Sequence, residues 1–214
     1  MKKISESICY IGADDPTLDL FESQYPLEEG MAYNSYLIKD SKTAILDTVD
    51  GRCGEIWKNT LREALGTTTP DYLVVHHMEP DHSGLIAWAL ENYPEMQLVA
   101  SAKAIQMLGQ FFDEAIFQGR TLIVKEGDTL SLGAHTLRFF AAPMVHWPEV
   151  MVSFEEKEGV LFSADAFGKF GTLEKCGFWG DEDDDWACEA RRYYFNICGK
   201  YGVPVQTLLR KVSA

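Results

Sequence analysis

The sequence lacks several features that mark common classes of protein. It has no apolar run of about 18 residues, so we expect no transmembrane helix and no membrane partner. The basic start, residues 1–15, has no apolar core of signal-peptide length, and we expect a cytoplasmic protein. Basic residues are also scarce: 19 Lys and Arg stand against 33 Asp and Glu, a net charge of −14. An acidic surface repels phosphate backbones, which argues against nucleic-acid binding.

The five cysteines do not form the spacing of a cofactor site or a disulfide framework. Their number is odd and none belongs to a Cys-X-X-Cys pair; they are Cys9, Cys53, Cys176, Cys188 and Cys198. A zinc ribbon, a cysteine-ligated iron–sulfur cluster and a secreted disulfide scaffold are therefore disfavoured. We expect free thiols in a reducing compartment.

The 214 residues are enough for one well-buried domain and too few for two of ordinary size, so we expect a single domain over residues 1–214. Residue patterns predict strands at 8–11, 33–39, 43–47, 71–76, 97–100, 121–125, 135–141, 150–154 and 160–162, with a hairpin turn at Asp40-Ser41. They predict helices at 54–66, 84–92, 102–112, 185–198 and 204–212. Strands, then strands mixed with helices, then strands again indicate a layered α/β sandwich.

One segment concentrates chemistry-bearing side chains. Residues 76–82 hold three histidines and two carboxylates at the end of a predicted strand. Titratable groups at this density must be solvated, paired with one another or bound to metal. Pro80 favours an extended conformation for Glu79 and argues against a helix here. In an extended run His77, Glu79 and Asp81 project together, since alternate residues share a face.

The neighbouring histidines have different expected roles. His82 follows Asp81 and would reach the same side from a turn at Ser83-Gly84, whereas His76 is out of phase and is expected to be structural. Two distant residues, His146 and Asp165, also follow predicted strands. Taken alone, each is an ordinary turn or capping residue. We treat His135 as structural, and the acidic run 181–185 as charge favoured by the dipole of the helix that follows.

Together these residues resemble a known family. The order His-X-Glu-X-Asp-His, then a distant His and a distant Asp, is similar to the metallo-β-lactamase superfamily, and Glu79 in place of a His resembles the flavodiiron proteins, or A-type flavoproteins. Four more segments agree, 33–38, 46–50, 146–148 and 165–168, so the resemblance covers nearly the whole chain. It implies a metallo-β-lactamase-like αββα sandwich, α/β in class.

The resemblance also implies a non-haem diiron centre. By it, His77, Glu79 and His146 hold one iron, Asp81 and His82 hold the second, and Asp165 bridges the two. The family adds one more histidine to the second iron, well downstream of Asp165, but no His follows His146 here. Either the chain is cut short, or another group or water fills that position.

The implied function is reduction of O2 to water and/or of NO to nitrous oxide. No Gly-rich phosphate loop occurs for the family's FMN, so FMN comes only from another domain or chain, and electrons need an external rubredoxin-like or flavoprotein donor. The family's head-to-tail homodimer brings flavin to iron, and without that flavin domain homodimerisation stays an open alternative. Trp147, Phe167 and the Tyr193-Tyr194 pair are candidates for an apolar gas pocket or for plain core packing.

Two other functions remain open at this point. The first is a diiron module that binds O2 as a sensor without turnover. The second is a zinc hydrolase of the same superfamily, such as a thioesterase or lactonase, in which zinc lowers the pKa of its bound water.

Overall fold

A computed structural model of the chain describes residues 1–213. Its strands are β1 Lys2–Lys3, β2 Ile8–Tyr10, β3 Ala13–Asp15, β4 Leu20–Phe21, β5 Tyr25–Pro26, β6 Met31–Tyr33, β7 Tyr36–Lys39, β8 Thr43–Leu46, β9 Tyr72–Val75, β10 Gln97–Ser101, β11 Thr121–Val124, β12 Thr129–Ser131, β13 Thr136–Ala141, β14 Met151–Glu155 and β15 Val160–Phe162. Its α-helices are α1 Gly54–Leu65, α2 Pro80–Ser83, α3 Ile86–Asn92, α4 Ala102–Phe111, α5 Leu173–Cys176, α6 Trp186–Ile197 and α7 Gly202–Val212.

Two large sheets organise these elements. The first has seven strands in the order β1-β2-β7-β8-β9-β10-β11, and its members β8 to β11 run parallel. The second has four antiparallel strands in the order β12-β13-β14-β15. Lys39 pairs with Thr43 across β7 and β8, which confirms the hairpin predicted at Asp40-Ser41. Because β8 and β9 are parallel neighbours, their carboxyl ends bring distant residues to one sheet edge.

Alternate residues along the strands face two separate layers of the hydrophobic core. Val74 and Val99 face the second sheet, where they pack with Leu137 and Phe139. Their neighbours Leu73 and Leu98 face the other way, toward the helices. Each such fully buried aliphatic side chain stabilises the fold by roughly 1.5–3 kcal/mol.

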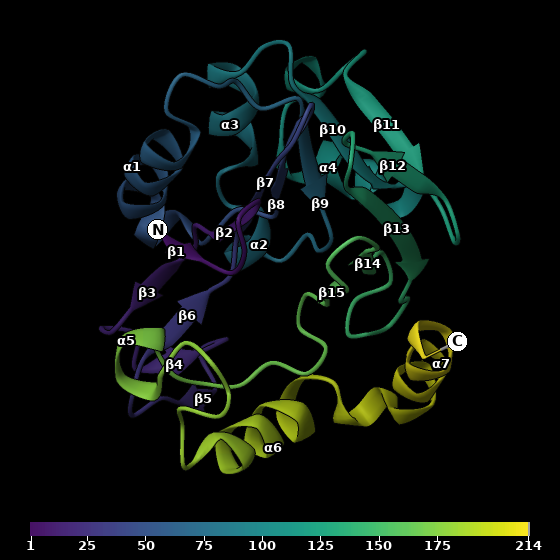
Figure 1. The fold of residues 1–214 in the computed structure, drawn as a ribbon. Coiled ribbons are helices and arrows are strands. Elements are labelled where there is room, and N and C mark those ends of the chain that lie inside the picture. Colours follow the sequence, from purple (N-terminus) through teal and green to yellow (C-terminus); the bar gives the residue numbers. More distant parts are fainter. Residues whose placement is uncertain (214) are drawn as a thin grey trace.

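Helices cover the outer faces of both sheets. On the first sheet, Trp57 and Leu61 of α1 share the helix-side core with Leu108 of α4. Figure 1 places α7 beside the end of β13, and Val205 and Leu208 of α7 belong to the same buried cluster as Val152 of β14. The order helix, sheet, sheet, helix confirms the predicted αββα sandwich. No helix within residues 1–213 combines the length and apolar character that crossing a membrane requires.

Two local predictions need correction, and several short elements were not predicted. The strand predicted at 33–39 is interrupted at Asn34-Ser35 between β6 and β7, and the residue patterns missed β1, β3, β4, β5, β12 and α5. The prediction that Pro80 prevents a helix is wrong, because Pro80 occupies the first turn of α2. A proline is tolerated there since the first-turn N–H groups have no partner within the helix. Glu79 before it is extended as predicted, with φ −61° and ψ 145°.

Candidate metal centre

The six predicted ligands converge from four separate parts of the chain. His77 and Glu79 follow β9 in extended backbone, while Asp81 and His82 lie on the single turn of α2. His146 comes from the loop between β13 and β14, and Asp165 from the loop after β15. The structure therefore brings all six together. Asp81 was predicted in an extended run and His82 on a turn at Ser83-Gly84, but both lie on the helical turn of α2.

The first cluster consists of His77, Glu79, His146 and Asp165, whose candidate ligand atoms all lie within 4.8 Å of one another. His146 Nε2 lies 3.0 Å from Glu79 Oε2 and 3.2 Å from Asp165 Oδ2. His77 Nε2 lies 3.3 Å from the same Glu79 oxygen and 3.2 Å from the same Asp165 oxygen. Two imidazole nitrogens and two carboxylate oxygens thus face one point.

The second cluster consists of Asp81, His82 and Asp165. His82 Nε2 lies 2.9 Å from Asp165 Oδ1, the oxygen that the first cluster does not use. Asp165 therefore offers Oδ2 to one cluster and Oδ1 to the other. A carboxylate that offers one oxygen to each cluster is suited to bridging two metal ions, which in dinuclear sites lie roughly 3.5–4 Å apart.

Burial makes the charges of this site strongly interdependent. Burial opposes ionisation of Glu79, but hydrogen bonds from His146 and His77 lower its pKa to about 2. Burial likewise opposes a charged His146, yet hydrogen bonds to Asp165 and Glu79 raise its pKa to about 9. In the metal-free chain, protonated imidazoles thus supply positive charge that cations would supply in a loaded site.

Asp81, like Asp15 and Glu149, has a buried carboxylate oxygen that lacks a hydrogen-bond partner. In Asp81 this oxygen is Oδ1. Burial, with the nearby Asp165 and Glu79 carboxylates, raises its pKa to about 7 despite the opposing effect of His82. A buried, unpartnered carboxylate oxygen is costly unless a cation binds it. The donor set and this orphaned oxygen therefore fit a pair of divalent metal ions.

Left-handed backbone accompanies two of the candidate ligands. Met144, two residues before His146, has φ +65°, and Ala164, immediately before Asp165, has φ +49°. Non-glycine residues in this region carry a cost of order 1–3 kcal/mol and tend to cluster at functional sites. The loops that carry His146 and Asp165 are therefore held in conformations that their local sequences alone do not favour.

Two carboxylates that touch the ligands were not among the predicted site residues. Glu149 Oε1 lies 2.7 Å from His77 Nδ1 and also accepts the backbone N–H of Met78. Asp47 Oδ2 lies 3.4 Å from His82 Nδ1. Asp47 lies within the family-like segment 46–50, and Glu149 directly follows the segment 146–148, but neither position by itself indicates that the acid contacts a ligand histidine.

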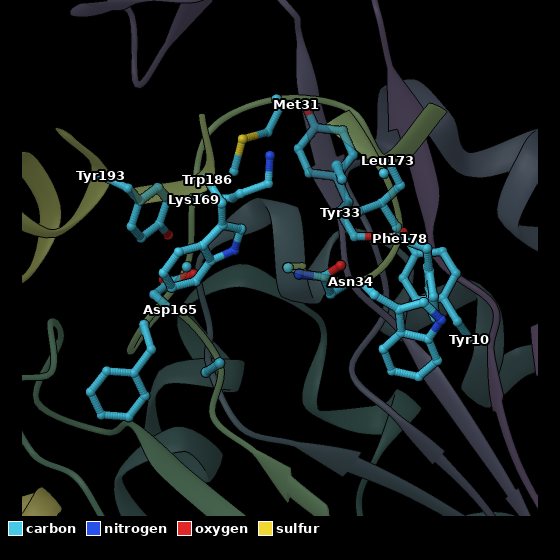
Figure 2. A pocket seen from close by; sticks show the side chains of 18 of the residues that line it. Tyr10, Met31, Tyr33, Asn34, Asp165, Lys169, Leu173, Phe178, Trp186 and Tyr193 are labelled. Atoms are coloured by element: carbon cyan, nitrogen blue, oxygen red, sulfur yellow. Dashed lines mark hydrogen bonds between the residues drawn. The ribbon is translucent and has the colours of Figure 1, made fainter. Parts of the chain in front are cut away.

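An open cavity of about 260 Å³ reaches the second cluster at Asp81, His82 and Asp165. Its wall is rich in aromatic rings: Tyr10, Tyr33, Tyr36, Phe167, Phe178, Trp179, Trp186 and Tyr193. Figure 2 shows Asp165 and Tyr193 on one side of this cavity and Tyr10 and Phe178 on the other.

The aromatic residues expected around a gas pocket have divided roles. Phe167 and Tyr193 line this cavity. Trp147 instead packs edge-on against the His77 ring, with ring centroids 5.1 Å apart, and Tyr194 packs against Phe195. Trp147 therefore supports a candidate ligand rather than the cavity wall.

Gly84, which ends the turn carrying Asp81 and His82, offers a test of how tightly that turn is held. A Cβ at Gly84 would lie 2.8 Å from Pro80 O and 2.9 Å from both Gly51 N and Val49 O. All three are backbone atoms, so we expect Gly84→Ala to lower the free energy of unfolding by about 1–3 kcal/mol. Gly51→Ala is the matched control, because its Cβ would meet nothing within 4 Å. Urea unfolding of both variants checks this, and equal stability would contradict it.

The fold is that of a metallo-β-lactamase-like domain, and it carries two adjacent candidate metal-ligand clusters. A family model described as "ODP family beta lactamase" matches residues 31–188, and the chain belongs to this family. Its relatives are diflavin flavoproteins and flavodiiron proteins.

Two curated relatives illustrate the match. The chain is 34% identical over 214 residues to a putative diflavin flavoprotein A 1 of Nostoc sp., covering 99% of this chain and 36% of that protein. It is 31% identical over 213 residues to the anaerobic nitric oxide reductase flavorubredoxin of Vibrio vulnificus, covering 98% of this chain and 42% of that protein. The chain therefore spans well under half the length of these relatives.

Solved structures agree with this assignment. Rubredoxin oxygen:oxidoreductase from the anaerobe Desulfovibrio gigas superposes with a TM-score of 0.91 at 28% identity, over 99% of this chain and 52% of that one. The flavodiiron protein from Giardia intestinalis also gives a TM-score of 0.91, at 25% identity over 99% of this chain and 51% of that one. The predicted fold and family are confirmed, and the chain belongs to a family of diiron oxidoreductases.

Proposed function

We propose that residues 1–214 form the metal-binding domain of a flavodiiron-type oxidoreductase that reduces O2 to water and/or NO to nitrous oxide. The main support for this proposal is the position of the Asp165 carboxylate, whose Oδ2 lies in the first cluster and whose Oδ1 lies in the second. His77, Glu79 and His146 would hold one iron, Asp81 and His82 the other, and Asp165 both. The expected cytoplasmic location stays a prediction.

The donor set favours iron over zinc. Glu79 supplies a carboxylate, a harder ligand than imidazole, and so shifts the preference toward iron or manganese. Two ferrous ions carry four positive charges, and Glu79, Asp81 and Asp165 carry three negative ones, so one hydroxide makes the buried centre neutral. When bound, such a pair of ferrous ions supplies two electrons to a small diatomic substrate.

The protein residues have separate tasks in this reaction. Glu149 orients His77 through its Nδ1, which leaves Nε2 directed into the cluster. The cavity that reaches Asp81, His82 and Asp165 has a wall rich in aromatic rings, and a small apolar molecule such as O2 or NO is compatible with it. Further electrons come from outside these residues, through a rubredoxin-like or flavoprotein donor. The names flavorubredoxin and rubredoxin oxygen:oxidoreductase among the similar proteins support such a donor.

Metal content is the first test. Protein purified without oxygen from iron-rich medium is expected to contain about two irons per chain, one for each cluster. About one iron would show that the second cluster, with its three candidate ligands, does not hold a metal by itself. Two zincs with little iron would contradict the proposal and favour the hydrolase, which a thioester assay would then examine.

Turnover is the second test. Iron-loaded protein with a reduced rubredoxin or flavoprotein donor is expected to consume O2 or NO catalytically, and a gas electrode measures the rate. Uptake of O2 that is later released unchanged, with no donor oxidation, would contradict reductase activity and favour the sensor. The rates with O2 and with NO, measured side by side, identify the preferred substrate.

A further inference from the structure

Asp47 lies outside both ligand clusters, but its carboxylate contacts His76 and the candidate ligand His82. It follows β8 directly, is buried, and has left-handed backbone with φ +54°. Its Oδ1 accepts the backbone N–H of His76 at 2.7 Å, and its Oδ2 lies 3.0 Å from His76 Nδ1. The same Oδ2 lies 3.4 Å from Nδ1 of His82, a candidate ligand of the second cluster.

His76 joins this carboxylate to the second sheet. Its Nε2 lies 2.8 Å from the hydroxyl of Ser153, a fully buried residue of β14. Its carbonyl accepts the backbone N–H of Met151, also on β14, at 3.1 Å. Asp47 is therefore fixed from the first sheet by its own strand and from the second sheet through His76.

The arrangement determines which nitrogen of His82 is free. When a carboxylate accepts a hydrogen bond from the Nδ1–H group of a neutral imidazole, the lone pair lies on Nε2. In His82 that nitrogen lies 2.9 Å from Asp165 Oδ1, in the second cluster. Glu149 has the equivalent position in the first cluster, 2.7 Å from His77 Nδ1. Each cluster thus has one ligand histidine whose Nδ1 faces a carboxylate outside the ligand set, and Asp47 shares its oxygen between His82 and His76.

We propose that Asp47 is the positioning residue of the second metal site, held in place by His76 and Ser153, and that it sets the affinity of that site separately from the first. This inference rests on the proposed diiron function. Asp47→Asn keeps the shape of the side chain but places an N–H₂ group against one of its N–H neighbours. The substitution therefore opposes the tautomer of His82 that presents Nε2 to the cluster, without removing a ligand.

The experiment measures metal affinity and needs no turnover. Wild type, Asp47→Asn and Glu149→Gln are prepared metal-free and titrated anaerobically with Fe²⁺ against a chelator of known affinity. Wild type is expected to bind about two ions. Asp47→Asn is expected to weaken one of them by about 10–100-fold, the usual effect of losing a partner of a ligand histidine. Asp71→Asn is the matched control. Asp71 accepts hydrogen bonds from Lys42 and from the Thr43 N–H, and it precedes β9, at the end of that strand opposite to the ligands.

A mutant cycle identifies which site is affected. If Asp47 acts through His82, Asp47→Asn has no further effect on metal affinity in a His82→Ala background, but keeps its full effect in a His77→Ala background. Glu149→Gln is expected to show the reverse pattern. If Asp47→Asn weakened metal binding by the same factor in both backgrounds, the assignment of Asp47 to the second site would be overturned.

The outcomes separate this inference from the proposed function. A wild type that binds no iron contradicts the diiron function itself. A wild type that binds two ions, with Asp47→Asn unchanged in both affinities, contradicts the positioning role alone. If circular dichroism shows Asp47→Asn unfolded, Ser153→Ala replaces it, since it releases His76 while keeping Asp47 and His82. Ser153→Ala is expected to weaken the second ion several-fold, and an unchanged affinity overturns the inference.

Discussion

Asp165→Asn is expected to remove at least one metal ion per chain and to lower the rate of O2 or NO reduction by roughly 1000-fold. The wild-type carboxylate gives one oxygen to each cluster, whereas an amide keeps one oxygen and replaces the other with an N–H₂ group that cannot bind a cation. Losing a shared metal ligand removes several kcal/mol of transition-state stabilisation, and each 1.36 kcal/mol is tenfold in rate.

Asp181→Asn is the control for this substitution, since Asp181 is exposed and lies outside both clusters. It makes the same change of charge and is expected to keep both ions and the wild-type rate. Metal analysis and a gas electrode on the two variants give the comparison. An Asp165→Asn protein with two ions and near wild-type turnover would show that Asp165 does not bridge.

The ligand segment could be predicted from sequence because its members are neighbours. Four of the six candidate ligands lie within residues 77–82, and a strand end that gathers polar titratable groups is informative by itself. His146 and Asp165 were different: each alone is an ordinary loop residue, and only the family pattern joined them to the segment. Residue patterns predicted six of the seven strands of the first sheet, most of which are buried apolar runs, but missed β1, whose Lys2 and Lys3 are exposed.

The parts that could not be predicted depend on contacts between distant residues. Glu149 contacts His77 across 72 positions, and Asp47 contacts His82 across 35. Neither pairing leaves a local signal, since an acid beside a strand is usually a turn residue. The turn at Pro80 was misjudged for another reason: proline is disfavoured inside a helix but suits its first turn, and residue type alone does not distinguish the two positions.

The metal-free chain is expected to lose stability as pH rises from 6.5 to 9, and the metal-loaded chain is not. The pKa of His146 is raised from its ordinary 6.5 to about 9 by hydrogen bonds to Asp165 and Glu79. Between these values the folded chain holds a proton that the unfolded chain has released, so the free energy of unfolding falls with pH. The shift corresponds to about 3 kcal/mol across the window, because each unit is about 1.4 kcal/mol.

Two other groups act in the neighbouring pH ranges. The pKa of Asp81 is raised from 3.8 to about 7, so it too makes the metal-free fold less stable as pH rises across that range. The pKa of Glu79 is lowered from 4.5 to about 2, which gives a contribution present above pH 4.5 and lost as pH falls toward 2. This cluster therefore favours the metal-free fold most in mildly acidic solution, between the range of Glu79 and that of His146.

Metal ions reverse the dependence because they bind the deprotonated ligands. Loading releases the proton from His146, so stabilisation by the metal grows as pH rises. Urea unfolding of chelator-treated and iron-loaded protein, followed anaerobically at several pH values between 6.5 and 9, measures the divergence. His146→Gln, which has no proton to lose in this range, is expected to flatten the slope of the metal-free chain. Parallel slopes for the loaded and metal-free forms would mean that cations do not take the place of the imidazolium charge.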